Sequence, residues 1–171
     1  MPTTHPLTLT TPTDREIVLT RVFDAPRTMV WEALTRPEYL RRWLLGPPGW
    51  TMTVCEIEPR VGSSYRYEWR KDDGTVMGMG GVIREVVPNT RLAATERFDQ
   101  SWYPGEGEVF QDLSERDGKT TLTTTLRYES KEARDAVARS GATSGMELGY
   151  ARLDELLAAG LAGRANSSGA R

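Results

Sequence analysis

The stretch from residue 51 to residue 128 consists of short β-strand-like runs separated by tight-turn sequences. Tyr65, Tyr67 and Trp69 alternate with charged residues, so the aromatic side chains share one face of a strand. The Asp-Gly pairs at 73–74 and 117–118 supply the positive φ angles that two-residue hairpin loops require. Such short connections join antiparallel neighbours. This stretch therefore predicts an antiparallel meander with one apolar face.

Seven segments are predicted to be strands, because they are rich in β-branched and aromatic residues and are bounded by turn residues. They are Glu16–Phe23, Thr51–Glu58, Ser63–Arg70, Val76–Val87, Arg91–Asp99, Glu108–Glu115 and Thr120–Tyr128. Two short helices are predicted after the first strand. Pro26 suits the first turn of one, and Thr35–Glu38 has capping-box spacing for the other, which should run to Trp43.

The C-terminal part of the chain predicts further helices. One covers Lys131–Arg139, and a longer one starts at a capping box over Ser144–Glu147 and ends at Gly160. The longer helix carries one apolar stripe, which has an obvious place to be buried on the apolar face of the sheet. The predicted fold class is α+β, with a curved antiparallel sheet wrapped around a long C-terminal helix.

The length of 171 residues suits a single domain. We expect a flexible N-terminal arm over residues 1–14, one domain over 15–160 and a flexible tail over 161–171. The start of the chain lacks the pattern of a secretory signal and no apolar run is long enough to span a bilayer, so we expect a cytoplasmic protein.

The charge and the reactive side chains exclude several functions. With 22 Lys and Arg against 24 Asp and Glu, the chain has no basic field for nucleic acid or an anionic membrane. The single His5 lies in the N-terminal arm and the single Cys55 lies in a predicted strand. Zinc sites of Cys and His, Ser-His-Asp triads and Cys-His dyads need more of these residues, so neither a metal nor a cofactor is expected.

Several motifs resemble a known family when they are read in order. They are Arg21–Pro26, Val30–Ala33, Pro37–Trp43, Pro59–Gly62, Gly81–Glu85, Pro88–Leu92 and Gly149–Leu156. Together they resemble START-like proteins of the SRPBCC superfamily, and more narrowly the branch named after the activator of heat shock protein 90 ATPase. The resemblance implies a helix-grip fold with a hydrophobic cavity between the sheet and the last helix. Members of this superfamily hold lipids, sterols or polyketides in that cavity, and some are cyclases or hydrolases.

Aromatic and Met side chains are the candidates for lining the cavity, because they bury much area and fill irregular apolar space. The predicted cavity residues are Trp43, Trp50, Tyr67, Trp69, Met79, Phe110, Met146, Tyr150 and Leu153. The alternative is that these side chains simply pack in the hydrophobic core and line no cavity. Trp102 and Tyr103, in the loop before Pro104, are further candidates for a pocket rim. Gly149 on the buried stripe indicates either close packing or free volume for a ligand.

Glu96 is the candidate for catalysis. It is in phase with Leu92 and Phe98, so it points inward with them, and a buried carboxylate needs a partner. Arg21 could be that partner, or the carboxyl group could have a raised pKa and act as an acid or base. The alternatives are a structural ion pair and a Glu at the end of the strand that is already in water. Cys55 is expected to be a small buried apolar side chain.

Three functions follow from these observations. We favour a protein that binds a small hydrophobic molecule in the cavity over an enzyme. The alternatives are an interaction protein that binds a chaperone, and a cyclase- or hydrolase-like enzyme that uses Glu96. The chain is expected to be a monomer or a homodimer, with Thr120–Tyr128 as an edge strand that could pair with a second copy.

Overall fold

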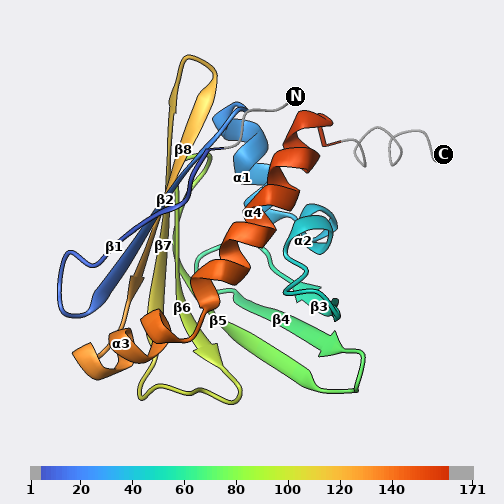
Figure 1. Cartoon of the computed structure of the whole chain (residues 1–171). Coiled ribbons are helices and arrows are strands. Elements are labelled where there is room, and N and C mark those ends of the chain that lie inside the picture. Colours follow the sequence, from blue (N-terminus) through green and yellow to red (C-terminus); the bar gives the residue numbers. More distant parts are fainter. Residues whose placement is uncertain (1–4, 162–171) are drawn as a thin grey trace.

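Eight strands form one antiparallel sheet in the order β1-β2-β8-β7-β6-β5-β4-β3 (Figure 1). The computed structural model describes residues 5–161. The strands are β1 (Thr8–Thr10), β2 (Glu16–Phe23), β3 (Trp50–Glu56), β4 (Ser64–Lys71), β5 (Val76–Val87), β6 (Arg91–Phe98), β7 (Gly107–Arg116) and β8 (Lys119–Arg127). The helices are α1 (Arg27–Thr35), α2 (Pro37–Trp43), α3 (Lys131–Arg139) and α4 (Ala142–Ala158). The predicted α+β class and helix-grip arrangement are confirmed.

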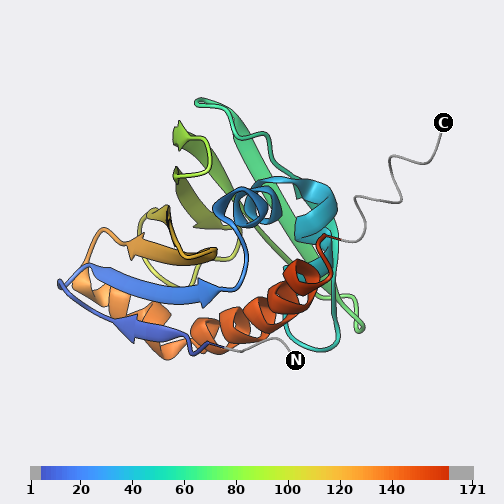
Figure 2. The same ribbon diagram turned by 90° about the horizontal axis from the view of Figure 1, so that it is seen from above.

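Residue alternation gives the sheet one buried face. In β2 the side chains of Ile17, Leu19, Arg21 and Phe23 are buried, whereas the residues between them are partly exposed. Figure 2 shows that the sheet curves around α1, α2 and α4, which lie on its concave side. Burial of apolar area contributes roughly 25 cal/mol per Å². The concave face is therefore the face that the helices cover.

The tight turns have the expected conformations. Asp117 and Gly118 have φ angles of 53° and 75°, the positive pair of a type I′ turn between β7 and β8. Gly74, between β4 and β5, has a φ of 92°. These turns hold consecutive strands in register, and this register determines which side chains meet on the concave face.

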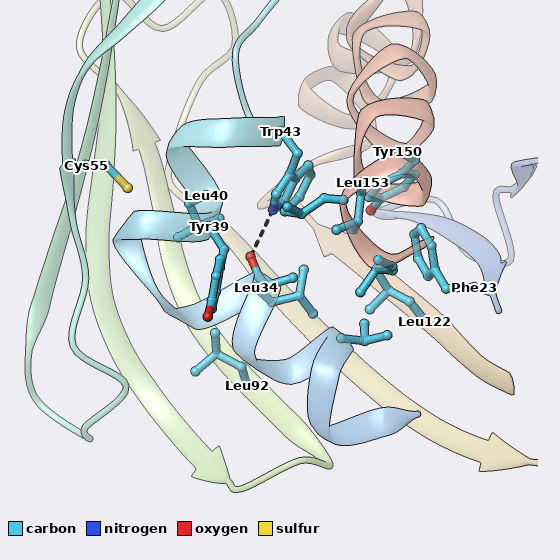
Figure 3. Packing of buried hydrophobic residues seen from close by; sticks show 14 of the residues in the cluster. Phe23, Leu34, Tyr39, Leu40, Trp43, Cys55, Leu92, Leu122, Tyr150 and Leu153 are labelled. Atoms are coloured by element: carbon cyan, nitrogen blue, oxygen red, sulfur yellow. Dashed lines mark hydrogen bonds between the residues drawn. The ribbon is translucent and has the colours of Figure 1, made fainter. Parts of the chain in front are cut away.

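The buried apolar side chains form two separate clusters. The larger one joins α1, α2 and α4 to the sheet, and Figure 3 shows part of it around Trp43, Leu34, Tyr150 and Leu153. The smaller one contains Ile17, Leu19, Tyr103, Tyr128, Ala133 and Val137. Met146 of α4 is partly buried and packs against both clusters. The core is therefore divided below the start of α4.

Two contacts fix α4 in place. Arg21 of β2 donates both terminal guanidinium nitrogens to the carboxylate of Asp154, with Nη1 and Oδ1 3.1 Å apart, and both side chains are more than nine-tenths buried. A Cβ atom at Gly149 would lie 3.6 Å from the ring and the carbonyl oxygen of Trp43 in α2. Trp43 in turn donates its Nε1 hydrogen to the carbonyl of Ala33 at 2.9 Å (Figure 3).

The long helix ends as predicted at Gly160, which has a φ of 65°. The amide of Leu161 donates to the carbonyl of Leu156 and that of Gly160 donates to the carbonyl of Leu157, which is a Schellman motif. Leu161 is 1% exposed, although it was assigned to the tail. The rest of the predicted tail, 162–171, and the first four residues of the predicted arm lie outside the described residues.

Both predicted capping boxes are wrong. The Thr35 hydroxyl belongs to the last turn of α1 and donates to the Trp31 carbonyl at 2.7 Å, so α2 has no side-chain cap. Helix α4 starts two residues before Ser144, after Gly141 with a φ of 80°. Positive φ at Gly141 turns the chain directly from α3 into α4.

Two expectations about the sheet edges also need correction. The Thr120–Tyr128 segment is not an edge strand, because β8 lies between β2 and β7. One edge is β1, whose residues 8–10 were assigned to the arm and pair with β2 through Thr8–Thr20 and Thr10–Val18. Strand β2, which was predicted to be the first strand, is therefore an inner strand. Within residues 5–161 the edges of the sheet are β1 and β3.

Candidate ligand-binding site

Glu96 lies on the concave face of β6. It pairs with Gly107 of β7, and the flanking pairs Gly80–Arg97 and Ile83–Ala94 place Gly81 of β5 on its other side. Both lateral neighbours of Glu96 are therefore glycines. A Cβ atom at Gly81 would lie 2.0 Å from the Thr95 carbonyl oxygen, and one at Gly107 would lie 3.3 Å from the Tyr128 ring. The close approach of backbone and ring explains why these positions carry no side chain.

Four tyrosines lie within range of the Glu96 charge, which raises their pKa values, although burial is the larger cause. They are Tyr65 and Tyr67 of β4, Tyr103 of the loop between β6 and β7, and Tyr128 directly after β8. We call Glu96 and these four tyrosines the Glu96 site. Tyr65 and Tyr67 belong to the larger apolar cluster and Tyr103 and Tyr128 to the smaller one. The Glu96 site therefore lies where the two clusters meet.

The Glu96 carboxyl group is enclosed but not packed against a partner. Burial raises its pKa from 4.5 to about 7. Within residues 5–161, no hydrogen bond or ion pair to this side chain is found. The residue nevertheless keeps part of its accessible surface. The Glu96 side chain is therefore largely enclosed, keeps some accessible surface and has no protein partner among the described residues.

Tyr103 is the second unsatisfied group of the site. It is 5% exposed, and its hydroxyl has no hydrogen-bond partner among the described residues. Tyr65, in contrast, donates its hydroxyl hydrogen to the Thr95 carbonyl at 2.7 Å. A buried hydroxyl without a partner costs about 1–3 kcal/mol, so the Tyr103 hydroxyl is a free donor and acceptor beside Glu96.

The loop that carries Tyr103 is held at both ends. Asp99 accepts from Arg66 of β4 at 2.6 Å, and the Glu106 amide donates to the Glu129 carboxylate at 2.5 Å. The Tyr103 ring packs edge-on against Tyr128, with centroids 5.2 Å apart. Exposed Trp102 packs at a tilt against Phe98, with ring centroids 4.8 Å apart. The loop thus holds one tyrosine inside the site and one tryptophan at its outer edge.

Helix α4 carries small or adaptable side chains in its first two turns. Met146 spans the two clusters, and a Cβ atom at Gly145 would meet no atom within 4 Å. Gly145 thus leaves room for a larger side chain at this position of α4. By contrast, Gly149 one turn later contacts Trp43.

Two depressions on the outer surface lie away from this site. One, of about 350 Å³, is lined by Thr13, Arg15, Glu16 and Arg127. The other, of about 540 Å³, lies beside Trp31 of α1 and Ile57, with Arg36 and Glu58 at its rim. Charged or open walls make both poor sites for an apolar molecule, because apolar ligands need an enclosing wall. The Glu96 site, inside the concave face, is the better candidate.

The known proteins that resemble this chain agree with the fold. The family model described as Activator of Hsp90 ATPase homolog 1-like protein matches residues 24–158. The chain belongs to this family. The resemblance found in the sequence motifs is thereby confirmed. No curated protein matches the chain.

Several solved structures share the fold of this family member. A protein from Rhodobacter sphaeroides is 34% identical, with a TM-score of 0.86, and the match covers 91% of this chain and 99% of that one. A protein from Mycobacterium smegmatis is 26% identical, with a TM-score of 0.78 and coverage of 89% and 97%. One from Chromobacterium violaceum is 28% identical, with a TM-score of 0.72 and coverage of 84% and 97%.

Most of the predicted cavity residues of this family member lie in the core. Five are buried, namely Trp43, Tyr67, Trp69, Tyr150 and Leu153. Trp69 donates its Nε1 hydrogen to the Leu44 carbonyl at 2.8 Å, and the Trp43 and Tyr150 rings pack with centroids 5.9 Å apart. Trp50, Met79 and Met146 pack at the margin of the larger cluster. The end of the concave face near α2 is therefore filled by side chains.

Phe110 requires a correction. Gly107, Val109 and Leu113 of β7 face the core, so Phe110 points to the other face of the sheet. There the guanidinium groups of Arg91 and Arg127 lie 5.0 and 4.9 Å from its ring centroid. Cation–π contacts stabilise an aromatic ring outside the apolar core. An aromatic residue in a strand can therefore lie on either face of the sheet.

The predictions for Glu96, Arg21 and Cys55 have different outcomes. Glu96 points inward as expected, but Arg21 is not its partner, because Arg21 pairs with Asp154. Cys55 is buried and free, and burial raises the pKa of its thiol to about 11, so it stays protonated at neutral pH. Tyr65 and Tyr128 were not singled out, although Tyr128 continues the inward phase of Leu122 and Thr124.

Among residues 5–161 no group of three or more His, Cys, Asp or Glu side chains could hold a metal ion. In the same residues no helix is long and apolar enough to cross a membrane.

Proposed function

We propose that the chain binds a small, mainly apolar molecule between the first turns of α4 and the Glu96 site. The observation that carries the proposal is the Glu96 carboxyl group, which is enclosed by protein, accessible and without a partner. Folding does not favour an unpartnered carboxyl group on an inner apolar face. Ligand binding explains why the carboxyl group is there, because a small number of polar groups in an apolar site fix the orientation of the bound molecule.

The division of the core supports the same proposal. Side chains fill the end of the concave face near α2, whereas the two apolar clusters stay separate at the Glu96 site. Met146 bridges them with a flexible thioether side chain. A bound molecule in this position would join the two clusters and contact the tyrosine rings.

The proposal is tested with simple neutral probes. Isothermal titration calorimetry with 2-phenylethanol and 1-octanol should show saturable binding of the wild-type protein. Met146→Trp places a larger side chain between the two clusters and should abolish binding. Leu148→Trp is the matched control, because Leu148 lies on the same helix and is exposed. Loss of binding in both variants or in neither would contradict the proposed site.

An acid–base activity is the second candidate function, because the Glu96 pKa of about 7 suits proton transfer at neutral pH. Glu96 would take a proton from the carbon next to a carbonyl group, and the Tyr103 hydroxyl would donate a hydrogen bond to the enolate oxygen. Return of a solvent proton completes the exchange. Deuterium uptake by 2-octanone in D₂O, followed by NMR, should then require Glu96. Equal uptake with Glu96→Gln would remove this candidate.

A further inference from the structure

We propose that the ligand of the Glu96 site is a cationic amine on an apolar body, held by the Glu96 carboxylate and the surrounding tyrosines. This inference rests on the proposed binding function and names the chemical class of the ligand. The three observations behind it are the missing counter-ion of Glu96, the four aromatic rings around it and the unpartnered Tyr103 hydroxyl.

The first observation concerns charge. The other buried acidic side chain on the concave side, Asp154, has Arg21 as its counter-ion. Arg97 follows Glu96 in β6 but is exposed and has the opposite phase. No cation within residues 5–161 pairs with Glu96. A buried charge is stable only when it is paired, so an amine from a ligand supplies the charge that the protein itself omits.

The second observation is that the side chains near Glu96 are tyrosines. Aromatic faces attract cations, and this attraction strengthens when the ammonium group is desolvated among Tyr rings. The Tyr103 hydroxyl oxygen can accept one ammonium hydrogen and the Glu96 carboxylate can accept the others. A carboxylate ligand would instead face Glu96 as a like charge. The site therefore discriminates between ligand charges.

Among the groups of residues 5–161 that face the site, only Glu96 has a shifted pKa close to neutral pH. Tyr65 and Tyr67 of β4, Tyr103 of the loop and Tyr128 after β8 all have raised pKa values, because of burial first, and stay neutral. The nearest further charges are Arg97, which acts on Tyr103, and Glu106, which acts on Tyr65. Cys55, next to Tyr67, also stays protonated.

The test compares three probes of the same shape, namely 2-phenylethylamine, 2-phenylethanol and phenylacetate. Calorimetry at pH 8 should show the amine binding at least tenfold more tightly than the alcohol, and phenylacetate binding least. At pH 6 about a tenth of Glu96 is ionised, so the affinity for the amine should be about tenfold lower than at pH 8. The affinity for the alcohol should not fall.

Two variants separate this inference from the proposed function. Glu96→Gln keeps the shape and should remove both the preference for the amine and its pH dependence. Glu108→Gln changes an exposed carboxylate on the adjacent strand and should keep both. Binding of the alcohol with an equal or lower affinity for the amine would overturn the inference and leave the proposed function intact. Failure of all three probes to bind would overturn both.

Discussion

Glu96 faces Gly107 across the β6–β7 ladder, so the one inward carboxyl group of β6 has a glycine as its partner in the register. On its other side the register places Gly81. No side chain from either neighbouring strand at these positions satisfies the carboxyl group, and the tyrosines around it are neutral. Because Glu96 is buried without a partner, its pKa is raised in the folded protein. Its ionisation should therefore change both the stability of the fold and the affinity for a ligand.

Stability should fall as the pH rises through the range in which Glu96 titrates. The folded-state pKa of about 7 lies above the ordinary value of 4.5. Between these values the unfolded chain ionises while folded Glu96 stays protonated, so stability is lost from about pH 4.5 to pH 7 and is level above. The difference corresponds to roughly 3 kcal/mol at most. Urea unfolding at pH 5 to 8 measures it, and Glu96→Gln should flatten the profile. An unchanged profile in that variant would contradict the assignment.

At lower pH, the ion pairs of Asp99 and Asp135 should make the stability fall as the pH falls. Hydrogen bonds from Arg66 lower the pKa of Asp99, and hydrogen bonds from Lys131 and Arg134 lower that of Asp135. Groups with a lowered pKa stabilise the fold above their unfolded-state values and lose that contribution as the pH falls. The maximum of stability should therefore lie between pH 4 and pH 6. A maximum at pH 8 in the same urea series would contradict this account.

Two tyrosine substitutions should have different effects on stability. Tyr103→Phe removes a buried hydroxyl that has no partner, so the free protein should be unchanged or up to about 1 kcal/mol more stable. Tyr65→Phe removes the hydrogen bond to the Thr95 carbonyl and leaves that oxygen unsatisfied, so it should cost about 1–2 kcal/mol. Thermal unfolding of both variants tests the difference. Equal losses would show that the Tyr103 hydroxyl is satisfied.

Helix α4 should depend on the ion pair between Arg21 and Asp154. Asp154→Asn leaves the guanidinium group buried without a counter-charge and should cost about 3–5 kcal/mol. The double variant Arg21→Met with Asp154→Leu should recover most of that loss. The exposed pair of Arg60 and Glu58 serves as the control, and Glu58→Gln should change the stability by less than about 0.5 kcal/mol. A double variant as unstable as Asp154→Asn would show that the pair itself is required.

Two glycines should respond differently to alanine. Gly149→Ala places a methyl group in ordinary contact with Trp43, and an alanine in a helix is about 1 kcal/mol better than a glycine. It should therefore be neutral or stabilising. Gly81→Ala places a methyl group 2.0 Å from the Thr95 carbonyl oxygen and should destabilise the fold strongly. If Gly149→Ala destabilised the protein instead, the contact between α4 and α2 would be tighter than described.

The sequence predicted the sheet well because its periodicity is local. The alternation of Tyr65, Tyr67 and Trp69 and the Asp-Gly turns determine strands and hairpins without knowledge of distant residues. The same alternation placed Glu96 inside. The family resemblance implied the same helix-grip arrangement; the structure confirms the fold and the match over residues 24–158 confirms the family.

The site was harder to predict because it depends on pairing between strands. The partner of Arg21 is Asp154, 133 residues later, so no local pattern could separate it from Glu96. The glycines beside Glu96 become neighbours only through the register of β5, β6 and β7. Phe110 was misplaced because its cover comes from Arg91 and Arg127 on other strands.

The ionisation of Glu96 with and without an amine tests the central claim most directly. In protein labelled with ¹³C at the Glu carboxyl carbons, NMR titration should give Glu96 an apparent pKa near 7 in the free state. Saturating 2-phenylethylamine should lower that pKa, because the ammonium group favours the carboxylate. An apparent pKa near the ordinary value of about 4, unchanged by the amine, would contradict both the enclosure of Glu96 and its role in binding.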